Sequence, residues 1–338
     1  MYCLGVESSC DETAVAILRM DADGSVKIVA EEISSQIDMH KAYGGVVPEL
    51  AAREHLKNLP LITDYVLNKS GLSLKDIGLI AVTKGPGLKG CLLIGTNFAR
   101  GLSLAYNTPV IGINHIEAHI FSVFLDNPEI QFPFLSLIVS GGHTEIILVE
   151  ELGKYKLMSR TLDDAAGEAF DKTANLLGIA YPGGAKLAAY ADSVSSTRFK
   201  LPKVMRSAEG FSFSGLKTAI MLLVKANQEE IKNEKNTLCE ISFAVQEAIV
   251  EALYFKLDQI VKESGVNTIA VAGGVSANKA LRKRLSDQKH LKVYYPSMLH
   301  CTDNAAMIAY LGLQRFSKLK SADPEELNVL ARWPVESI

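Results

Sequence analysis

Cys3-Leu-Gly-Val-Glu-Ser8 is an apolar segment of strand length, and it is followed by the polar turn Ser9-Cys-Asp-Glu12 and by a second apolar segment, Thr13 to Met20. Two such segments joined by a short polar turn are typical of paired strands. Val26 to Ile33 predicts a third strand after the turn Asp21-Ala-Asp-Gly24. The start of the chain therefore predicts three consecutive strands.

The same pattern returns in the second half of the sequence. Leu135 to Ser140 and Glu145 to Val149 predict a strand pair around the turn Gly141-Gly-His-Thr144, and Tyr155 to Thr161 predicts the third strand. In each half a helical pattern and another strand follow, which indicates an internal duplication of roughly 150 residues.

Later segments complete the two halves. The spacing of apolar residues predicts helices over 48–69, 91–106, 165–177, 215–225, 238–262, 277–286 and 305–316, and strands over 79–83, 110–113, 268–272 and 291–294. We therefore expect an α/β protein with two similar lobes facing a central cleft. The N-terminal lobe is expected over 1–133 and the C-terminal lobe over 134–301, with 302–338 packing back on the first.

The composition is that of an ordinary globular protein. The 338 residues are 48% hydrophobic and 22% charged, which suits two domains or one large one. A net charge of −3 gives no overall attraction to nucleic acid, so any RNA binding depends on local patches.

The cysteines and the lengths of the apolar runs indicate the cellular compartment. The five cysteines are scattered and lack C-x-x-C spacing, which indicates a reduced intracellular protein. The sequence shows no basic start with a cleavable apolar region and no apolar run of about 18 residues. We expect a cytoplasmic protein that does not bind a membrane.

The segment His115-Ile-Glu-Ala-His119 carries the strongest chemical signal. Two histidines four residues apart on a helix lie on one face and can bind the same metal ion. Asp303, just before the predicted helix 305–316, offers a carboxylate as third ligand. Such a set leaves coordination positions open, which suits a catalytic metal. The alternative is that both histidines are ordinary core or surface residues.

Glu117 distinguishes this segment from a zinc peptidase. In the peptidase motif H-E-x-x-H the glutamate lies beside the metal-binding face and acts as a base. Glu117 is two residues from each histidine, roughly 200° around the helix at about 100° per residue. We expect its carboxylate to point away from the metal.

Glycine pairs occur at three places where a predicted strand or loop ends: Gly141-Gly142, Gly183-Gly184 and Gly273-Gly274. Without a Cβ atom, backbone N–H groups can approach a phosphate or a nucleoside closely. Each pair alone is more often an ordinary turn. Together with the histidine pair, they favour a nucleotide site.

A series of motifs in chain order closely resembles the TsaD family, formerly known as O-sialoglycoprotein endopeptidases. The motifs are Glu7-Ser-Ser-Cys-Asp11-Glu12-Thr13, Tyr43-Gly-Gly-Val-Val-Pro-Glu49, Gly85-Pro-Gly-Leu88, the His115/His119 pair, Val139-Ser-Gly-Gly-His143-Thr144, Gly167-Glu-Ala-Phe-Asp171-Lys172, Tyr181-Pro-Gly-Gly184, Phe213-Ser-Gly-Leu-Lys217, Gly273-Gly-Val-Ser-Ala-Asn278, Cys301-Thr-Asp303-Asn304 and Ala331-Arg-Trp-Pro334.

The resemblance implies two RNase H-like lobes of the actin, Hsp70 and sugar-kinase (ASKHA) superfamily. It also implies a transferase that moves the threonylcarbamoyl group from threonylcarbamoyl-AMP to the exocyclic amine of adenosine 37, in tRNAs that read ANN codons. In bacteria the expected partners are the paralogue TsaB and the ATPase TsaE. Nucleotides of the ATP or ADP type would fit the donor site.

The resemblance also implies the site residues. His115, His119 and Asp303 would bind one iron or zinc ion per subunit. The donor would be held by Ile138, Val139, Ser140, Gly141, Gly142, Asp171, Gly184 and Asn278. The chain has Ala188 where many relatives carry an acidic residue, so we expect Asp171 to take a larger part in nucleotide recognition.

Asp11 and Glu12 are the candidate catalytic carboxylates, because they lie in the first turn and can accept the proton of the attacking amine or order its approach. Backbone N–H groups of Ser140-Gly-Gly142 could stabilise developing negative charge. Alternatively, Asp11 is a plain turn residue and Glu12 a solvated one.

Basic residues are the candidates for tRNA contacts. They are the loop group Arg198, Lys200, Lys203 and Arg206, and the helical group Lys279, Arg282, Lys283 and Arg284. Such groups are more often simply solvated. Lys217, which follows Phe213-Ser-Gly, could instead face a phosphate or be a solvated helix residue.

As a whole, the sequence leaves two further classes of function open. An ATPase or sugar kinase of the same superfamily does not need the histidine pair, and a metallopeptidase conflicts with the position of Glu117.

Overall fold

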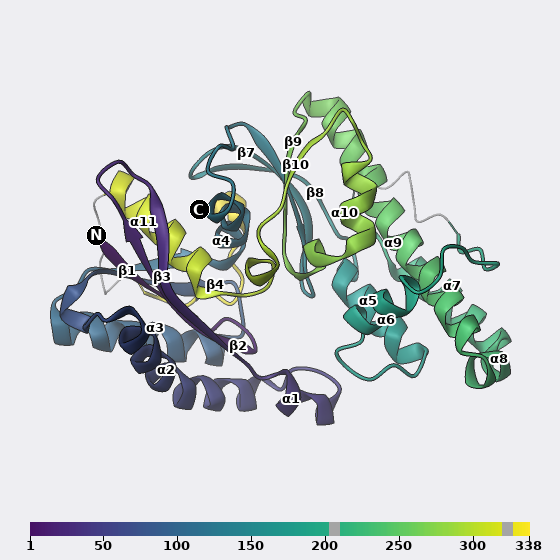
Figure 1. Ribbon diagram of the computed structural model, residues 1–338, viewed down its shortest axis with the longest axis horizontal. Coiled ribbons are helices and arrows are strands. Elements are labelled where there is room, and N and C mark those ends of the chain that lie inside the picture. The colour runs from purple at the N-terminus through teal and green to yellow at the C-terminus, as the bar shows by residue number, and fades with distance from the viewer. Residues whose placement is uncertain (203–209, 320–326) are drawn as a thin grey trace. The chain divides into compact units, whose positions relative to one another are not determined.

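The computed structural model describes residues 1–202, 210–319 and 327–338 (Figure 1). The chain divides into two compact units. The first contains Met1–Ile130, Leu152–Lys154 and Pro296–Ile338, and the second contains Gln131–Glu151 and Tyr155–Tyr295. The chain therefore leaves the first unit after Ile130, returns to it briefly at Leu152–Lys154 and returns again for its last segment.

A five-stranded mixed sheet in the order β3-β2-β1-β4-β5 forms the centre of the first unit. The first three strands are antiparallel neighbours, whereas β4 runs parallel to β1 and β5 parallel to β4. The strands are β1 (Tyr2–Glu7), β2 (Glu12–Met20), β3 (Val26–Ser35), β4 (Ile77–Gly85) and β5 (Val110–Asn114). The helices are α1 (Ile37–His40), η1 (Lys41–Tyr43), α2 (Pro48–Ser70), η2 (Leu74–Asp76), α3 (Lys89–Tyr106), α4 (His115–Ser122), η3 (Val123–Leu125), η5 (Met298–His300), α11 (Ala305–Leu319) and η7 (Val335–Ser337).

Strand β1 contacts helices on both faces of this sheet. Leu4 and Val6 point into a buried cluster that includes Leu59 and Val66 of α2. Gly5, between them in sequence, faces the opposite side, where α11 packs (Figure 1). A Cβ atom on Gly5 would lie 2.3 Å from the carbonyl oxygen of Ala305. The missing side chain therefore lets the start of α11 pack directly on the strand.

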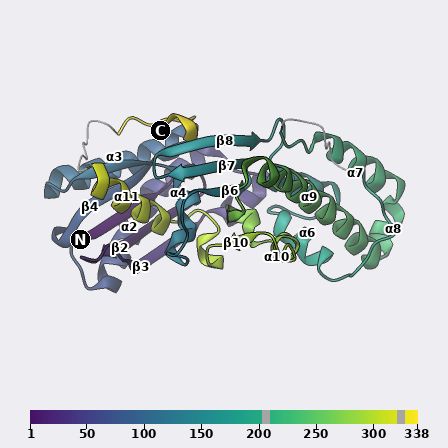
Figure 2. The same ribbon diagram turned by 90° about the horizontal axis from the view of Figure 1, so that it is seen from above.

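The second unit repeats the topology of the first. Its sheet has the order β10-β9-β6-β7-β8, with β6 antiparallel to β7 and parallel to β9. Figure 2 shows β6, β7 and β8 side by side. The strands are β6 (Phe134–Val139), β7 (Thr144–Glu151), β8 (Lys154–Arg160), β9 (Thr268–Ala272) and β10 (Lys292–Tyr294). The corresponding strand orders confirm the duplication that the sequence predicts.

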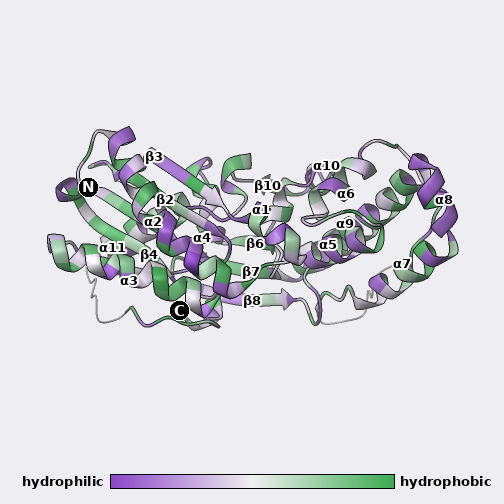
Figure 3. Ribbon diagram, turned by 90° about the horizontal axis from the view of Figure 1, so that it is seen from below, coloured by the Kyte–Doolittle hydropathy of each residue, from purple (hydrophilic) through white to green (hydrophobic). Residues whose placement is uncertain are grey.

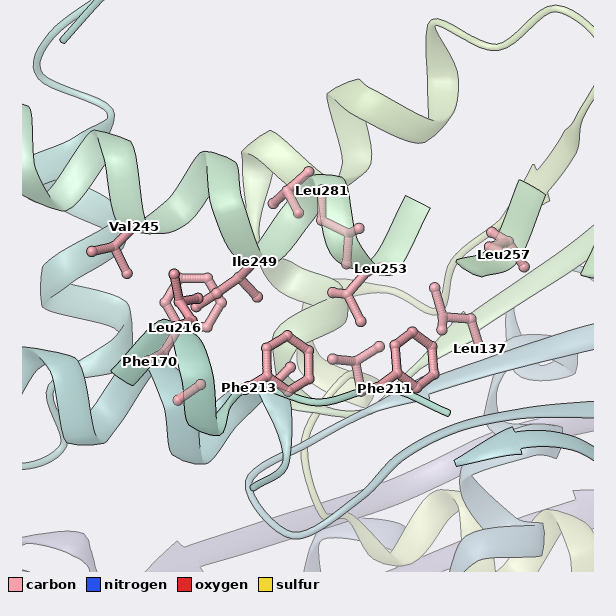
Figure 4. Packing of buried hydrophobic residues seen from close by; sticks show 14 of the residues in the cluster. Leu137, Phe170, Phe211, Phe213, Leu216, Val245, Ile249, Leu253, Leu257 and Leu281 are labelled. Carbon is pink, nitrogen blue, oxygen red and sulfur yellow. The ribbon is translucent and has the colours of Figure 1, made fainter. Parts of the chain in front are cut away.

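The helices of the second unit begin after β8 and continue up to β10. They are α5 (Ala166–Leu176), α6 (Gly184–Ala191), α7 (Ser214–Ala226), α8 (Gln228–Asn233), α9 (Lys235–Ser264), η4 (Gly274–Ala277) and α10 (Lys279–Ser286). Figure 4 shows Phe211 and Phe213 packed among leucines of α9 and β6. The sequence did not predict α6 and α8, which are short. Figure 3 shows α8 as largely hydrophilic, in agreement with its lack of buried residues.

In the part of the chain that the structure describes, no helix combines the length and the apolar character needed to cross a bilayer.

The Gly5 contact can be tested by substitution. We expect Gly5→Ala to lower the free energy of unfolding by about 1–3 kcal/mol, because the methyl group would overlap α11. Gly101→Ala is the matched control. It lies in α3 with no heavy atom within 4 Å of the new Cβ among the described residues, so it should stabilise by about 0.5–1 kcal/mol. Chemical denaturation measures both, and equal stability of Gly5→Ala and wild type would contradict the close packing.

Candidate functional site

Helix α4 begins directly where β5 ends. The side-chain oxygen of Asn114 accepts hydrogen bonds from the backbone N–H groups of Ile116 and Glu117, at 2.9 and 3.1 Å. This N-cap fixes the start of the helix at His115. All eight residues of α4 are buried, so the two histidines are held in place by packing on every side.

The two imidazoles and Asp303 converge. Asp303 Oδ1 lies 3.0 Å from Nε2 of His119 and 3.5 Å from Nε2 of His115. One ligand atom from each of the three residues falls within 4.8 Å of the others. Two imidazole nitrogens and one carboxylate that meet at a point fit the donor set of a divalent transition-metal ion with open positions. The structure thus brings together the three residues that the sequence suggested.

Glu7 is a member of this site to which the sequence analysis assigned no role. It is fully buried at the end of β1, and its Oε2 accepts a hydrogen bond from Thr83 Oγ1 at 2.6 Å and lies 3.1 Å from His115 Nδ1. A carboxylate can only accept there, so Nδ1 carries the proton and Nε2 is left to face Asp303. Buried carboxylates behind metal-binding histidines orient the ring in this way. A glutamate that ends an otherwise apolar strand was the available signal.

The charges around His115 affect its titration. Burial alone would lower the pKa of His115, but the carboxylates of Asp303 and Glu7 outweigh it and raise the pKa to about 9. At neutral pH a cation that binds Nε2 therefore has to displace a proton. His119 differs from His115, because its buried Nδ1 has no hydrogen-bond partner among the described residues.

Glu117 points away from the converging ligands, as its helical position predicts. It is fully buried and forms a two-pronged ion pair with Arg315 of α11, with contacts of 2.6 and 2.9 Å. Its carboxylate is therefore engaged by a guanidinium, and this is not the environment of a peptidase base. The pair instead joins the helix that carries the histidines to the helix that follows Asp303.

Asp11 and Glu12 lie next to this cluster in the first unit. Asp11 is in the loop between β1 and β2, whereas Glu12 is the first residue of β2, so the loop covers Ser8 to Asp11 and lies one residue earlier than the predicted turn. Burial and the neighbouring carboxylates of Asp303 and Asp11 raise the pKa of Glu12 well above its usual range. Glu12 is partly buried, and its Oε1 accepts a hydrogen bond from Ser35 Oγ at 3.4 Å, so its carboxyl group is not simply solvated.

The predicted donor-binding residues belong to the second unit. Ile138 and Val139 end β6, and Ser140, Gly141 and Gly142 form the turn to β7. The backbone N–H of Ser140 donates to His143 O at 2.8 Å, which closes this turn.

Two further glycines approach this turn closely. A Cβ atom on Gly167, at the start of α5, would lie 2.5 Å from Ser140 O. Gly273, which follows β9, has a positive φ of 88°, and a Cβ atom there would lie 2.5 Å from Val139 O. At Gly141 and Gly142 themselves, a Cβ atom would meet no described heavy atom within 4 Å. The turn is therefore packed from behind and bare where it faces outward.

Asp171 and Gly184 are in direct contact. Asp171 Oδ1 accepts hydrogen bonds from the backbone N–H groups of Gly183 and Gly184, at 3.0 and 2.7 Å. Asn278 is the N-cap of α10, where its Oδ1 accepts from Leu281 N at 2.9 Å and its Nδ2 donates to Gln246 at 2.8 Å. One oxygen of each side chain thus fixes the local backbone, and the second oxygen of Asp171 has no hydrogen-bond partner among the described residues.

The candidate basic residues differ in their surroundings. Arg198 pairs with Glu230, and Arg284 pairs with Glu251. Lys217, Lys279 and Lys283 are exposed. Lys203 and Arg206 lie outside the described residues.

Comparison with solved structures defines the class of fold. HypF from T. kodakarensis matches 97% of this chain and 49% of its own length, with a TM-score of 0.59 and 14% sequence identity. Component A of the (R)-2-hydroxyglutaryl-CoA dehydratase of Acidaminococcus fermentans matches 94% of this chain and all of its own, with a TM-score of 0.54 and 16% identity. These two likenesses show that the chain shares its α/β fold with both proteins.

Sequence comparison defines the family. The sequence model described as "TsaD: tRNA N6-adenosine threonylcarbamoyltransferase" matches residues 27–310. Proteins of that name from Thermosipho africanus and from Acidovorax sp. are 46% and 43% identical to this chain, covering 96% and 99% of it and 97% of each relative. The chain belongs to the TsaD family of tRNA N6-adenosine threonylcarbamoyltransferases.

The role of Glu7 leads to a prediction about metal affinity. We expect Glu7→Gln to fold and to bind a divalent metal about 10- to 100-fold more weakly, because the amide no longer orients and polarises His115 as the carboxylate does. The measurement is a competition titration of Zn²⁺ against a chelator. Glu229→Gln, an exposed glutamate on α8, serves as the control and should bind like the wild type. Equal affinities in all three proteins would exclude this role of Glu7.

Proposed function

We propose that this chain transfers the threonylcarbamoyl group of threonylcarbamoyl-AMP to the exocyclic amine of adenosine 37, in tRNAs that read ANN codons, and releases AMP. The observation that carries the proposal is the convergence of His115, His119 and Asp303 in a chain that is 43–46% identical to named threonylcarbamoyltransferases. In the reaction, a bond forms between the amine nitrogen and the carbamoyl carbon, and the bond from that carbon to the phosphate oxygen breaks.

The donor would bind at the bare turn of the second unit. Backbone N–H groups near Ser140, Gly141 and Gly142 are suited to a phosphate or to negative charge that develops during transfer. Asp171, Gly184 and Asn278, together with the strand end Ile138–Val139, would hold the nucleoside part. The second oxygen of Asp171, which no hydrogen bond among the described residues uses, supports the larger part we assign to Asp171 in a chain with Ala188.

The metal-binding proposal rests on the donor set. His115, His119 and Asp303 would hold one iron or zinc ion per subunit, and Glu7 would keep His115 in the tautomer that binds it. Such an ion supplies a positive charge that anchors donor oxygens and stabilises negative charge on them.

Asp11 is proposed to accept the proton of the attacking amine or to order its approach, and Glu12 to assist it. Asp11 lies in the loop after β1 and Glu12 begins β2, so the two carboxyl groups are neighbours in the first unit. A carboxylate placed beside the attacking amine is a suitable proton acceptor for general base catalysis.

The cellular compartment, the partners and the boundaries of the two lobes are proposed from the family alone. The chain would act in the cytoplasm on tRNA, with a TsaB paralogue and a TsaE ATPase as partners in a bacterium. The segments 1–133 and 134–301 would be the two ASKHA lobes, with 302–338 returning to the first.

Metal binding predicts a measurable loss. We expect the double change His115→Ala and His119→Ala to remove the roughly one metal ion per chain, because two of three protein ligands disappear. Elemental analysis of protein purified after loading with Fe²⁺ or Zn²⁺ measures it. His290→Ala, a half-exposed histidine of the second unit, should keep its metal. Equal metal in the double variant and the wild type would refute the site.

Asp11→Asn tests the mechanism. If Asp11 receives or orders the amine proton, the variant should keep fold, metal and donor binding and lose roughly 10²-fold or more in transfer rate. Single-turnover formation of threonylcarbamoyl-adenosine on a matched tRNA, with saturating donor and the candidate partners, measures it. Asp23→Asn in the exposed turn between β2 and β3 is the control. If Asp11 were only a turn residue, both variants would lose about 1 kcal/mol of stability or less and transfer normally.

A further inference from the structure

Two buried histidines outside the metal cluster, His40 and His55, lie in one hydrogen-bonded network with Gln36. All three belong to the first unit. Gln36 is the N-cap of α1, His40 ends α1, and His55 is in the second turn of α2. The proposed chemistry uses none of them, yet each is almost completely removed from solvent. Figure 1 shows α1 and α2 as consecutive segments that follow β3 in the chain.

The network holds the loop that carries Asp11 at three points between Cys10 and Thr13. His55 Nε2 donates to the carbonyl of Cys10 at 2.9 Å. The backbone N–H of Gln36 donates to the carbonyl of Asp11 at 3.0 Å. Thr13 Oγ1 and His55 Nδ1 are 2.8 Å apart. Every residue from Cys10 to Thr13 except Glu12 is therefore bound by this network.

The partners determine the protonation state of both rings. A carbonyl can only accept, so His55 Nε2 carries the hydrogen and Nδ1 accepts from Thr13 Oγ1. His40 Nδ1 accepts from the backbone N–H of Val47 at 3.3 Å, so His40 Nε2 donates to Gln36 Oε1, also at 3.3 Å. Gln36 Nε2 in turn points to Ala51 O and to His55 Nδ1. One consistent arrangement, with both histidines neutral and protonated on Nε2, satisfies the network.

We infer that Gln36, His40 and His55 are positioning residues that hold the Asp11 loop in its catalytic conformation. The inference rests on the proposed function of Asp11. The network also extends to Val47, the last residue of the glycine-containing segment 41–47, so the conformation of that segment and the position of Asp11 depend on the same hydrogen bonds. A shift of about 1 Å in a catalytic group can cost roughly 10²-fold in rate. Buried hydrogen bonds that fix this loop therefore help to keep the transfer rate high.

The surroundings of His55 support the neutral form. Burial lowers the pKa of His55, against the opposing effect of the Cys10 carbonyl and the carboxylates of Glu7, Asp11 and Glu54. Protonation of Nδ1 would turn an acceptor into a donor opposite Thr13 and Gln36. The folded protein binds this proton less readily than the unfolded chain does. The stability that neutral His55 contributes is therefore complete above the ordinary pKa of histidine, and it is lost as the pH falls through the lowered pKa of the folded state.

Substitution of His55 tests the inference. His55→Phe keeps a flat ring and removes both hydrogen bonds, whereas His55→Gln can still donate to Cys10 O. We expect His55→Phe to retain metal and donor binding and to lose roughly 10²-fold in single-turnover transfer, with His55→Gln recovering part of the loss. Thr13→Val provides a second variant should His55→Phe not fold, and it should lose transfer in the same direction. His290→Gln should transfer like the wild type.

Two further measurements separate positioning from simple stability. The acid limb of the pH–rate profile should change in His55→Gln, because glutamine does not titrate. Nitrogen NMR shifts of the rings should show both His40 and His55 as neutral Nε2–H tautomers. Normal transfer by folded His55→Phe, or an Nδ1–H tautomer of His55, would overturn the inference. A wild-type chain that transfers nothing would instead contradict the proposed function, and the ring tautomer would then decide on the network by itself.

Discussion

The first unit depends on one buried negative charge, the carboxylate of Glu7. A carboxylate without water is costly unless hydrogen bonds and a counter-charge compensate it. Here the compensation comes from Ser9 N, Thr83 Oγ1 and His115 Nδ1, which belong to the loop after β1, to β4 and to α4. Glu7 therefore joins three elements that are far apart in sequence, and it does so directly behind His115, one of the three converging side chains.

A second buried charge acts on the same helix from the other side. Glu117 and Arg315 connect α4 to α11, so the two histidines and the helix after Asp303 are held in a fixed relation. Removing one partner of such a pair typically costs about 3–5 kcal/mol, because the other charge is left buried alone. A loss of activity in a Glu117 variant would thus reflect altered packing of the ligand helices, and it would not identify a catalytic base.

The sequence predicted the elements well and the contacts between them poorly. Strand lengths and helical spacing are local properties, so β1, β2, α2 and α11 lie within a few residues of their predicted bounds. The geometry of the histidine pair followed from the period of a helix, as did the direction of Glu117. The role of Glu7 and the partner Arg315 did not follow, because they depend on which distant segments pack together. The short helices α6 and α8 were missed since they carry too few buried residues to produce a periodic pattern.

The duplication explains where the chemistry lies. In each unit the loop after the first strand carries candidate residues, but Ser8 to Asp11 supplies side chains where Ser140 to His143 supplies bare backbone.

The helices that follow the fifth strand of each sheet correspond as well. α4 follows β5 and α11 follows β10. Each helix is directly preceded by an asparagine, Asn114 or Asn304, whose side-chain oxygen accepts a hydrogen bond from a backbone N–H of the first turn. Because α11 packs in the first unit with α4, two topologically equivalent helix starts meet there. Their adjoining residues, His115 and Asp303, form the proposed metal-binding cluster together with His119. The cluster is thus a product of the repeat, with one half contributing imidazoles and the other a carboxylate.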